Sequence, residues 1–138
     1  MSAEILTRLL WAILIFAFGA VALALLNRGL LWRARRKGNL PPGFQPGRPA
    51  ILYFTTPECV PCKTLQRPAL QTVRERLGNA LQMIVINAYE HPDLADHWGV
   101  LSSPTTFILD NSGRARFANR GVARAEKLLE QIARLNQD

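Results

Sequence analysis

Apolar residues follow two different patterns along the chain, and the change falls near residue 48. Residues 9–26 form a continuous stretch without a charged or strongly polar side chain. After residue 48 the apolar residues occur instead in short runs and at helical spacing, separated by turn residues. The pattern predicts three parts: an anchor with a basic segment (1–37), a linker (38–48) and an α/β domain (49–138).

The first apolar stretch is long enough to cross a bilayer as a helix. At about 1.5 Å per residue, residues 9–26 would cover roughly 27 Å, close to the ~30 Å hydrocarbon core. Trp11 and Trp32 lie near the two ends of the helix, where indole rings favour the membrane interface. A cleaved signal peptide is the alternative, with residues 22–24 as its cleavage site, but the run exceeds the apolar core of such peptides. We therefore expect a retained single-pass transmembrane helix.

Positive charge is concentrated beside this helix. Residues 1–48 carry seven Lys/Arg and one acidic residue, whereas residues 49–138 carry ten and nine. The excess therefore suits anionic lipid headgroups better than nucleic acid, which we do not expect as a partner. Five basic residues follow the helix: Arg28, Arg33, Arg35, Arg36 and Lys37. The positive-inside rule then predicts a cytoplasmic domain, with the extracytoplasmic side as the alternative.

The linker is rich in residues that interrupt regular structure. Residues 38–49 contain four prolines and three glycines. Such a run cannot form a helix and has little apolar surface to bury. We expect a partly extended tether that keeps the domain within roughly 35–40 Å of the bilayer.

The first half of the domain predicts a strand–helix–strand unit. Residues 49–54 form an apolar run of strand length, typical of a central buried strand. Residues 61–77 show helical spacing, with Pro68 expected to kink the helix. Residues 81–87 form a second strand. A strand, a long helix and a second strand predict one parallel pair with a right-handed crossover.

The second half predicts a short helix, a hairpin and a closing helix. The short helix covers residues 90–98, and strands at 105–109 and 115–118 flank a turn. An amphipathic helix over residues 123–135 ends the domain. Together the elements predict a mixed four-stranded sheet with helices on both faces.

Both cysteines of the chain lie between the first strand and the following helix. The N–H groups and dipole at the start of a helix favour the thiolate of Cys59. Cys62 lies one turn further on, close enough to attack a mixed disulfide formed by Cys59. Two cysteines provide neither a disulfide framework nor the four ligands of a usual metal site, so we expect no metal and no cofactor. This arrangement favours thiol–disulfide exchange over a structural disulfide or two buried thiols.

Two motifs resemble the thioredoxin-like superfamily. The first is Cys59-Val60-Pro61-Cys62-Lys63 after a strand, and the second is the run 100–105 before a hairpin. The resemblance covers about residues 49–137, with Gly121 where the family often has a glycine before its last helix. Two motifs in this order are much more specific than a lone CxxC pair.

The resemblance implies a role for each site residue. Cys59 is expected to be the attacking nucleophile and Cys62 the resolving thiol. Pro104 matches the family's cis-proline, and the Ser103 backbone would hold the substrate. Val60 and Pro61 complete the expected substrate-binding residues, and Pro61 stiffens the first helical turn and lacks an N–H donor.

Two positions depart from the family pattern. Thioredoxins usually have a tryptophan directly before the first cysteine, and this chain has Glu58. A carboxylate there is expected to raise the pKa of the Cys59 thiol. The family's buried aspartate in the preceding strand is replaced by Tyr53, so the usual proton acceptor for Cys62 is missing.

These features predict a membrane-tethered thiol–disulfide oxidoreductase that acts on protein disulfides in the reducing direction. Its expected partners are protein substrates, a reductase or other electron donor, and the lipid bilayer. One alternative is a thioredoxin-like binding module with little turnover. Another is an extracytoplasmic redox factor in the maturation of envelope proteins or cytochromes.

Overall fold

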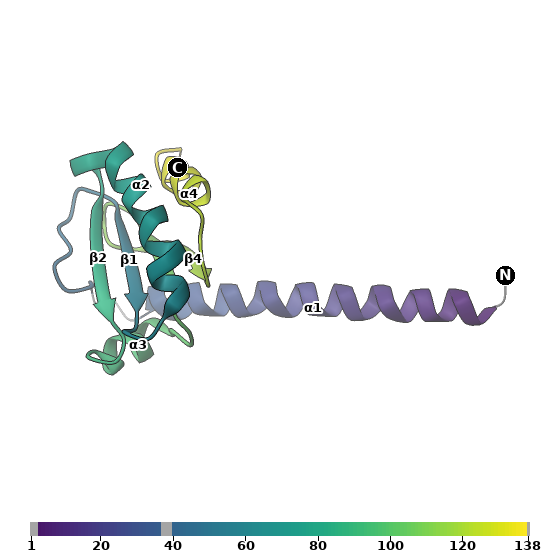
Figure 1. Ribbon diagram of the computed structural model, residues 1–138. Helices are drawn as coiled ribbons and strands as arrows, with labels where there is room; N and C mark the ends of the chain where they lie inside the picture. Colours follow the sequence, from purple (N-terminus) through teal and green to yellow (C-terminus); the bar gives the residue numbers. More distant parts are fainter. Residues whose placement is uncertain (1–2, 37–39, 138) are drawn as a thin grey trace.

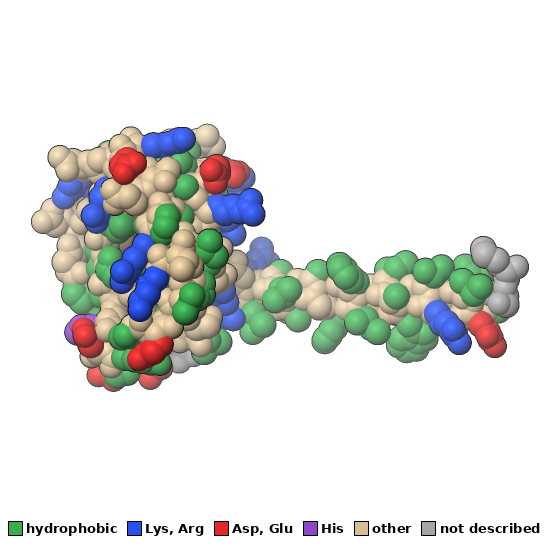
Figure 2. Space-filling model, viewed as in Figure 1, with side chains coloured by type: hydrophobic (Ala, Val, Ile, Leu, Met, Phe, Trp, Pro, Cys, Tyr) green, Lys and Arg blue, Asp and Glu red, His purple; other side chains and the backbone are tan. Residues whose placement is uncertain are grey.

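The N-terminal part of the molecule is one long exposed helix. The computed structural model describes residues 3–36 and 40–137, and only the backbone of residues 30 and 33–36. Helix α1 (Ala3–Arg36) projects far from the rest of the chain (Figure 1), and apolar side chains cover much of it (Figure 2). Its Ala3–Gly29 segment is long and apolar enough to cross a membrane, a test that a signal sequence also passes. Most of the predicted basic cluster after it, including Lys37, lies outside the described side chains.

The domain is built on a mixed four-stranded sheet, as predicted. Its strands are β1 (Ala50–Thr55), β2 (Gln82–Asn87), β3 (Thr105–Leu109) and β4 (Ala115–Arg120). They lie in the order β2-β1-β3-β4, with β2 parallel to β1 and the other two pairs antiparallel. All six residues of the central strand β1 are buried, which explains its uninterrupted apolar sequence.

Helices cover both faces of the sheet (Figure 1). On one face, α2 (Arg67–Leu77) and α4 (Ala125–Leu135) pack over the side chains of alternate strand residues, beginning with Ile51 and Tyr53 of β1. On the other face, α3 (Pro92–Trp98) and the last turns of α1 pack over Leu52 and Phe54. The pleat of β1 therefore divides the core into two clusters, one on each side of the sheet.

The helix that follows the cysteines contains a wide turn. Residues 61–77 were expected to form one helix kinked at Pro68, but Cys62–Gln66 form a π-helical turn before α2 begins. The Arg67 N–H donates to the Cys62 carbonyl, five residues back. Pro68 has no N–H, and its ring crowds the carbonyl four residues earlier, so the preceding turn widens. The proline thus changes which side chains face the sheet.

Residues 40–49, which we call the strap, lie against the domain. These described residues contain no helix or strand before Ala50 of β1, as predicted. The Gln45 N–H donates to Gln82 Oε1 at 2.8 Å, and Gln82 Nε2 donates to the carbonyls of Gln45 (2.7 Å) and Arg48 (2.9 Å). We expected a partly extended tether, whereas the strap is bonded to the domain through Gln82. The domain boundary at residue 49 stays a prediction, and residues 38–39 lie outside the described chain.

The strap also packs on the turn between β3 and β4. Gly113 in this turn has φ +84°, and a Cβ atom there would overlap Leu40 and come within 3.0 Å of Phe44 Cε1. Phe44 in turn packs on the core cluster that contains Trp98. A glycine is thus required both by the backbone conformation and by the close approach of the strap.

Candidate active site

The two cysteines lie where the carboxyl end of β1 meets the start of the next helix. Strand β1 ends at Thr55, and the Cys59 N–H donates to the Thr56 carbonyl at 3.2 Å, which closes a tight turn. Helical structure begins at Val60, and the Lys63 N–H donates to the Cys59 carbonyl. Cys59 therefore occupies the position at the helix start that was predicted from the sequence.

Cys59 and Cys62 form a disulfide with an S–S distance of 2.01 Å and a Cα–Cα distance of 5.3 Å. The Cys62 N–H donates to Cys59 Sγ at 3.2 Å. Cys59 retains 9% of its surface and lines a groove, whereas Cys62 is fully buried. A helix N–H directed at one sulfur, on the more accessible cysteine, is the arrangement that favours its thiolate.

The residues between the cysteines face solvent. Val60 is 65% exposed and lines the groove together with Pro61. Pro61 has φ −63°, the value that its ring imposes and that a helical first turn needs. These two residues form one edge of the groove beside Cys59.

Pro104 and Ser103 approach the cysteines from a distant part of the sequence. The Ser103–Pro104 bond is cis, as expected, and it directly precedes β3. The Gly121 N–H donates to the Pro104 carbonyl at 2.9 Å, so the start of the last loop supports this bend. Within the described residues, no hydrogen bond engages the Ser103 backbone, and Ser103 lines the groove. Pro104 itself is buried beside it.

The groove beside Cys59 has a volume of about 680 Å³ and is formed by three segments. The cysteine loop supplies one wall, α3 and the residues before it a second, and the loop before Pro104 a third. Sequence reasoning placed Cys59, Val60, Pro61 and Ser103 at the site, and all four line this groove. It missed Tyr89 and Asp96, whose segments carry no motif that points to the cysteines. It also gave no role to Leu101, although this residue lies within the run 100–105.

The two departures from the thioredoxin pattern lie in different environments. Glu58 is exposed and lines the groove next to Cys59. Tyr53 is only 1% exposed and belongs to the same core cluster as both cysteines. Its hydroxyl has no hydrogen-bond partner among the described residues. The core cluster that contains the disulfide therefore includes a buried hydroxyl without a partner among the described residues.

Gln66 holds the cysteine helix in place, and its role was not predicted. The side chain is fully buried, donates to the Ala123 carbonyl (3.1 Å) and accepts from the Ala123 N–H (2.9 Å). In the sequence Gln66 is a polar residue between the apolar positions of residues 61–77, and in the structure it lies buried at the end of the π-helical turn. Pro68 was the signal that could have indicated this change.

Metal ligands are not grouped in this structure. Over residues 3–36 and 40–137, no group of three or more His, Cys, Asp or Glu is placed to hold a metal ion.

Comparison with known proteins agrees with this geometry. The Thioredoxin family model matches residues 44–134, about two-thirds of the chain. The chain belongs to the thioredoxin family. With the Cys59–Cys62 disulfide, this membership supports a thioredoxin-like protein-disulfide oxidoreductase.

Individual thioredoxin relatives cover the domain but not the whole molecule. Chloroplastic thioredoxin Y of rice is 29% identical over 85 residues, which are 62% of this chain and 49% of the rice protein. A thioredoxin-like protein of Synechocystis is 27% identical over 85 residues and is covered to 79%. The chain thus spans about half the length of the rice relative.

A solved thioredoxin structure gives the same fold. Chloroplastic thioredoxin z superposes with a TM-score of 0.60 at 22% identity, covering 66% of this chain and 80% of that one. At this identity the likeness establishes the fold alone.

Proposed function

We propose that this chain is a membrane-tethered thiol–disulfide oxidoreductase that reduces disulfides in other proteins. The observation that carries the proposal is the asymmetry of the two sulfurs. Cys59 lines an open groove and its sulfur accepts a helix N–H, whereas Cys62 is fully buried. One sulfur is placed to meet a substrate, and the other is placed to act only within the chain.

In the proposed reaction, the Cys59 thiolate attacks a substrate disulfide. A bond forms between Cys59 and one substrate sulfur, and the other substrate sulfur leaves as a thiolate that takes a proton from solvent. The Cys62 thiol then loses its proton and attacks Cys59 Sγ, which releases the second substrate thiol and restores the Cys59–Cys62 disulfide. The substrate gains two electrons and two protons, so each cycle needs an external thiol or dithiol reductant.

The groove supplies the substrate contacts in this proposal. The free N–H and C=O of Ser103 would pair with an extended substrate backbone, as an added strand pairs with a sheet edge. Pro104 holds these groups beside Cys59, and Val60 and Pro61 contact the opposite side of the substrate. Protein disulfides fit such a groove better than small disulfides because the contacts are backbone-directed.

Insulin reduction by the full chain in detergent, with dithiothreitol as the electron source, tests this activity. We expect turnover that Cys59→Ser abolishes. Cys62→Ser should retain the first attack but lose multiple turnover. Equal insulin reduction by the unmutated chain and Cys59→Ser would contradict an enzymatic role and favour a binding module.

The proposal includes a membrane anchor and a cytoplasmic domain. Support for the anchor is the length and exposure of the apolar segment Ala3–Gly29. Support for the orientation is the excess of basic residues after this segment. A cytoplasmic domain would meet the reducing conditions that keep the two thiols reduced.

Thiol labelling in intact cells tests the orientation. A membrane-impermeant reagent should fail to label Cys59 until the cells are opened. Labelling from outside would place the domain in the envelope. The cytoplasm would then not be the direct source of electrons for the two thiols. A shortened protein that begins after residue 24 would instead reveal a cleaved signal peptide.

A further inference from the structure

The groove beside Cys59 is acidic, although the domain as a whole is nearly neutral. Among the described residues that line it, Glu58 and Asp96 are the only ionisable side chains other than Cys59 and Tyr89, and none is Lys or Arg. Both carboxylates are exposed. Over residues 49–138 as a whole, ten basic residues outnumber nine acidic ones, and these nine include Glu58 and Asp96. The negative charge is therefore local to the place where a substrate would dock.

The two carboxylates have no partner among the residues that the structure describes. Over the described residues, neither the Glu58 nor the Asp96 side chain forms an ion pair, and neither accepts a hydrogen bond. Further acidic residues, Glu90 and Asp93, lie before and within α3. In Figure 2 the visible face at the end of the domain where α3 lies shows Asp, Glu and His side chains. Together these acidic side chains would attract a cationic group to the groove.

Large apolar side chains surround the same groove. Leu101 is 77% exposed, Tyr89 67% and Val60 65%, and each lines the groove from a different segment. Exposed apolar side chains gathered at one site indicate an interaction surface. The Tyr89 ring adds a flat aromatic face, on which a guanidinium group stacks more favourably than an ammonium group.

We propose that this groove selects target segments in which an arginine and an apolar residue flank the reactive cysteine. The guanidinium lies between the Glu58 and Asp96 carboxylates and stacks on Tyr89. The apolar neighbour contacts Val60 and Leu101. This specificity rests on the proposed disulfide-reductase function, and it assigns to that function a class of protein substrate.

Peptide reduction measures this preference directly. Synthetic peptides with one internal disulfide would carry Arg, Lys, Gln or Glu beside the same cysteine, and kcat/KM would be measured with the full chain in detergent. Because two exposed charge pairs contribute modestly, we expect the Arg peptide to exceed the Glu peptide roughly three- to tenfold at low salt. The ratio should fall below about twofold at 0.5 M salt, where exposed charges are screened.

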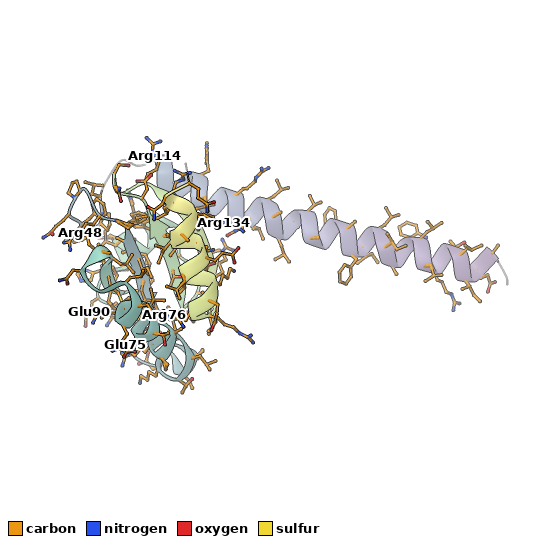
Figure 3. The ribbon with its side chains drawn as sticks, turned by 90° about the horizontal axis from the view of Figure 1, so that it is seen from above. Arg48, Glu75, Arg76, Glu90, Arg114 and Arg134 are labelled. Carbon is orange, nitrogen blue, oxygen red and sulfur yellow. A yellow bond between two sulfur atoms is a disulfide. The ribbon has the colours of Figure 1, made fainter. Side chains whose placement is uncertain are left out.

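Matched variants test which residues cause the preference. The double variant Glu58→Gln/Asp96→Asn should abolish the Arg-over-Glu ratio. The control Glu75→Gln/Glu126→Gln removes the same charge from exposed positions on α2 and α4 and should retain the ratio; Figure 3 labels Glu75. The ratio is the readout because Glu58 adjoins Cys59, and a change in Cys59 reactivity alters both peptides alike. Tyr89→Ser should reduce the Arg peptide to the rate of the Lys peptide.

The outcomes separate this inference from the function on which it rests. Equal rates for the Arg and Glu peptides, or a ratio that survives Glu58→Gln/Asp96→Asn, would overturn the charge selection while leaving the reductase intact. Equal rates for the Arg and Lys peptides would overturn the specificity for arginine. Failure of Cys59-dependent reduction with every peptide would instead refute the proposed function.

Discussion

The two ends of the sheet differ in whether their polar groups are hydrogen-bonded within the chain. At the end where β1 and β2 begin, the strap and the turn after β3 meet, and their polar groups bond to one another. Gln82 alone makes three side-chain hydrogen bonds to the strap. At the other end, the Glu58 and Asp96 carboxylates and the Ser103 backbone have no ion pair or hydrogen bond with the described residues. The polar groups at the first end bond within the protein. Those at the second end are available to the substrate that we propose.

This difference separates structural from functional positions. Changes at the strap end should lower stability and leave the chemistry of the folded protein intact. Changes at the cysteine end should alter the reaction and have little effect on stability. Four substitutions test the contrast, beginning with the largest expected effect.

Gly113→Ala should be the most destabilising of them. An alanine would be strained at φ +84° and would force Leu40 and Phe44 away from the turn. We expect a loss of about 2–4 kcal/mol, from backbone strain together with overpacking. Urea unfolding of the detergent-solubilised chain measures it. Gly43→Ala is the matched control, because Gly43 has φ +81° but no atom within 4 Å of the added Cβ. Equal losses in the two variants would show that the strap does not pack on this turn.

Gln82→Ala should cost about 1–3 kcal/mol because it leaves partly buried backbone groups of the strap unpaired. The same unfolding measurement applies. Gln71→Ala, which removes an exposed glutamine from α2, should change stability by less than about 0.5 kcal/mol. Insulin reduction per folded molecule should be unchanged in both variants. A lower rate for Gln82→Ala at full folding would mean that the strap influences the cysteine site.

Asp110→Asn should lower stability in a pH-dependent way. Burial alone would raise the pKa of Asp110. Hydrogen bonds from the Ser112 side chain and from the Arg114 and Ser112 N–H groups, together with the Arg116 charge, lower the pKa by more than burial raises it. The net pKa of Asp110 is therefore below its ordinary value. The ionised carboxylate therefore adds stability above its ordinary pKa, and this stability is lost as pH falls through the lowered pKa of the folded protein.

Unfolding at several pH values measures this effect. We expect the unmutated chain to exceed Asp110→Asn by about 1–2 kcal/mol at pH 7, the usual contribution of hydrogen bonds to a charged group. The gap should close in acid. A gap of constant size from pH 7 to pH 2 would exclude ionised Asp110 as its source. The Asp110–Arg116 ion pair, at 3.9 Å, contributes little of it.

Tyr53→Phe should have the smallest effect on stability, and its sign is informative. The hydroxyl is buried and has no hydrogen-bond partner among the described residues, so its removal should leave stability unchanged or raise it by up to about 1 kcal/mol. Tyr89→Phe alters an exposed ring and should have no effect. Clear destabilisation by Tyr53→Phe would show that the hydroxyl has a hydrogen-bond partner, for example a buried water.

The sequence predicted those parts of the molecule that depend on local pattern. The apolar run of β1 indicated a central strand, and the CxxC spacing with Pro104 indicated the site. The strap could not be predicted in this way. Its docking depends on Gln82, whose polar side chain at the start of β2 gives no sign of a bond to a segment 37 residues earlier.

The groove shows the same limit at the cysteine end. Tyr89 and Asp96 look like ordinary surface residues in sequence, and only the sheet order brings their segments beside Cys59. Gln66 was missed for a different reason, because Pro68 widened the turn and rotated a polar residue into the core. Local pattern therefore predicts the contacts between residues close in sequence, but not the contacts between residues far apart in it.

Trapping of the reaction intermediate tests the central claim, that Cys59 meets the substrate and Cys62 acts only afterwards. The reduced Cys62→Ser chain would be mixed with a protein disulfide, and the products would be analysed by non-reducing mass spectrometry. We predict a stable mixed disulfide through Cys59, and none when Cys59→Ser is used in the same way. A mixed disulfide that forms equally through Cys62 in the Cys59→Ser chain would contradict the account.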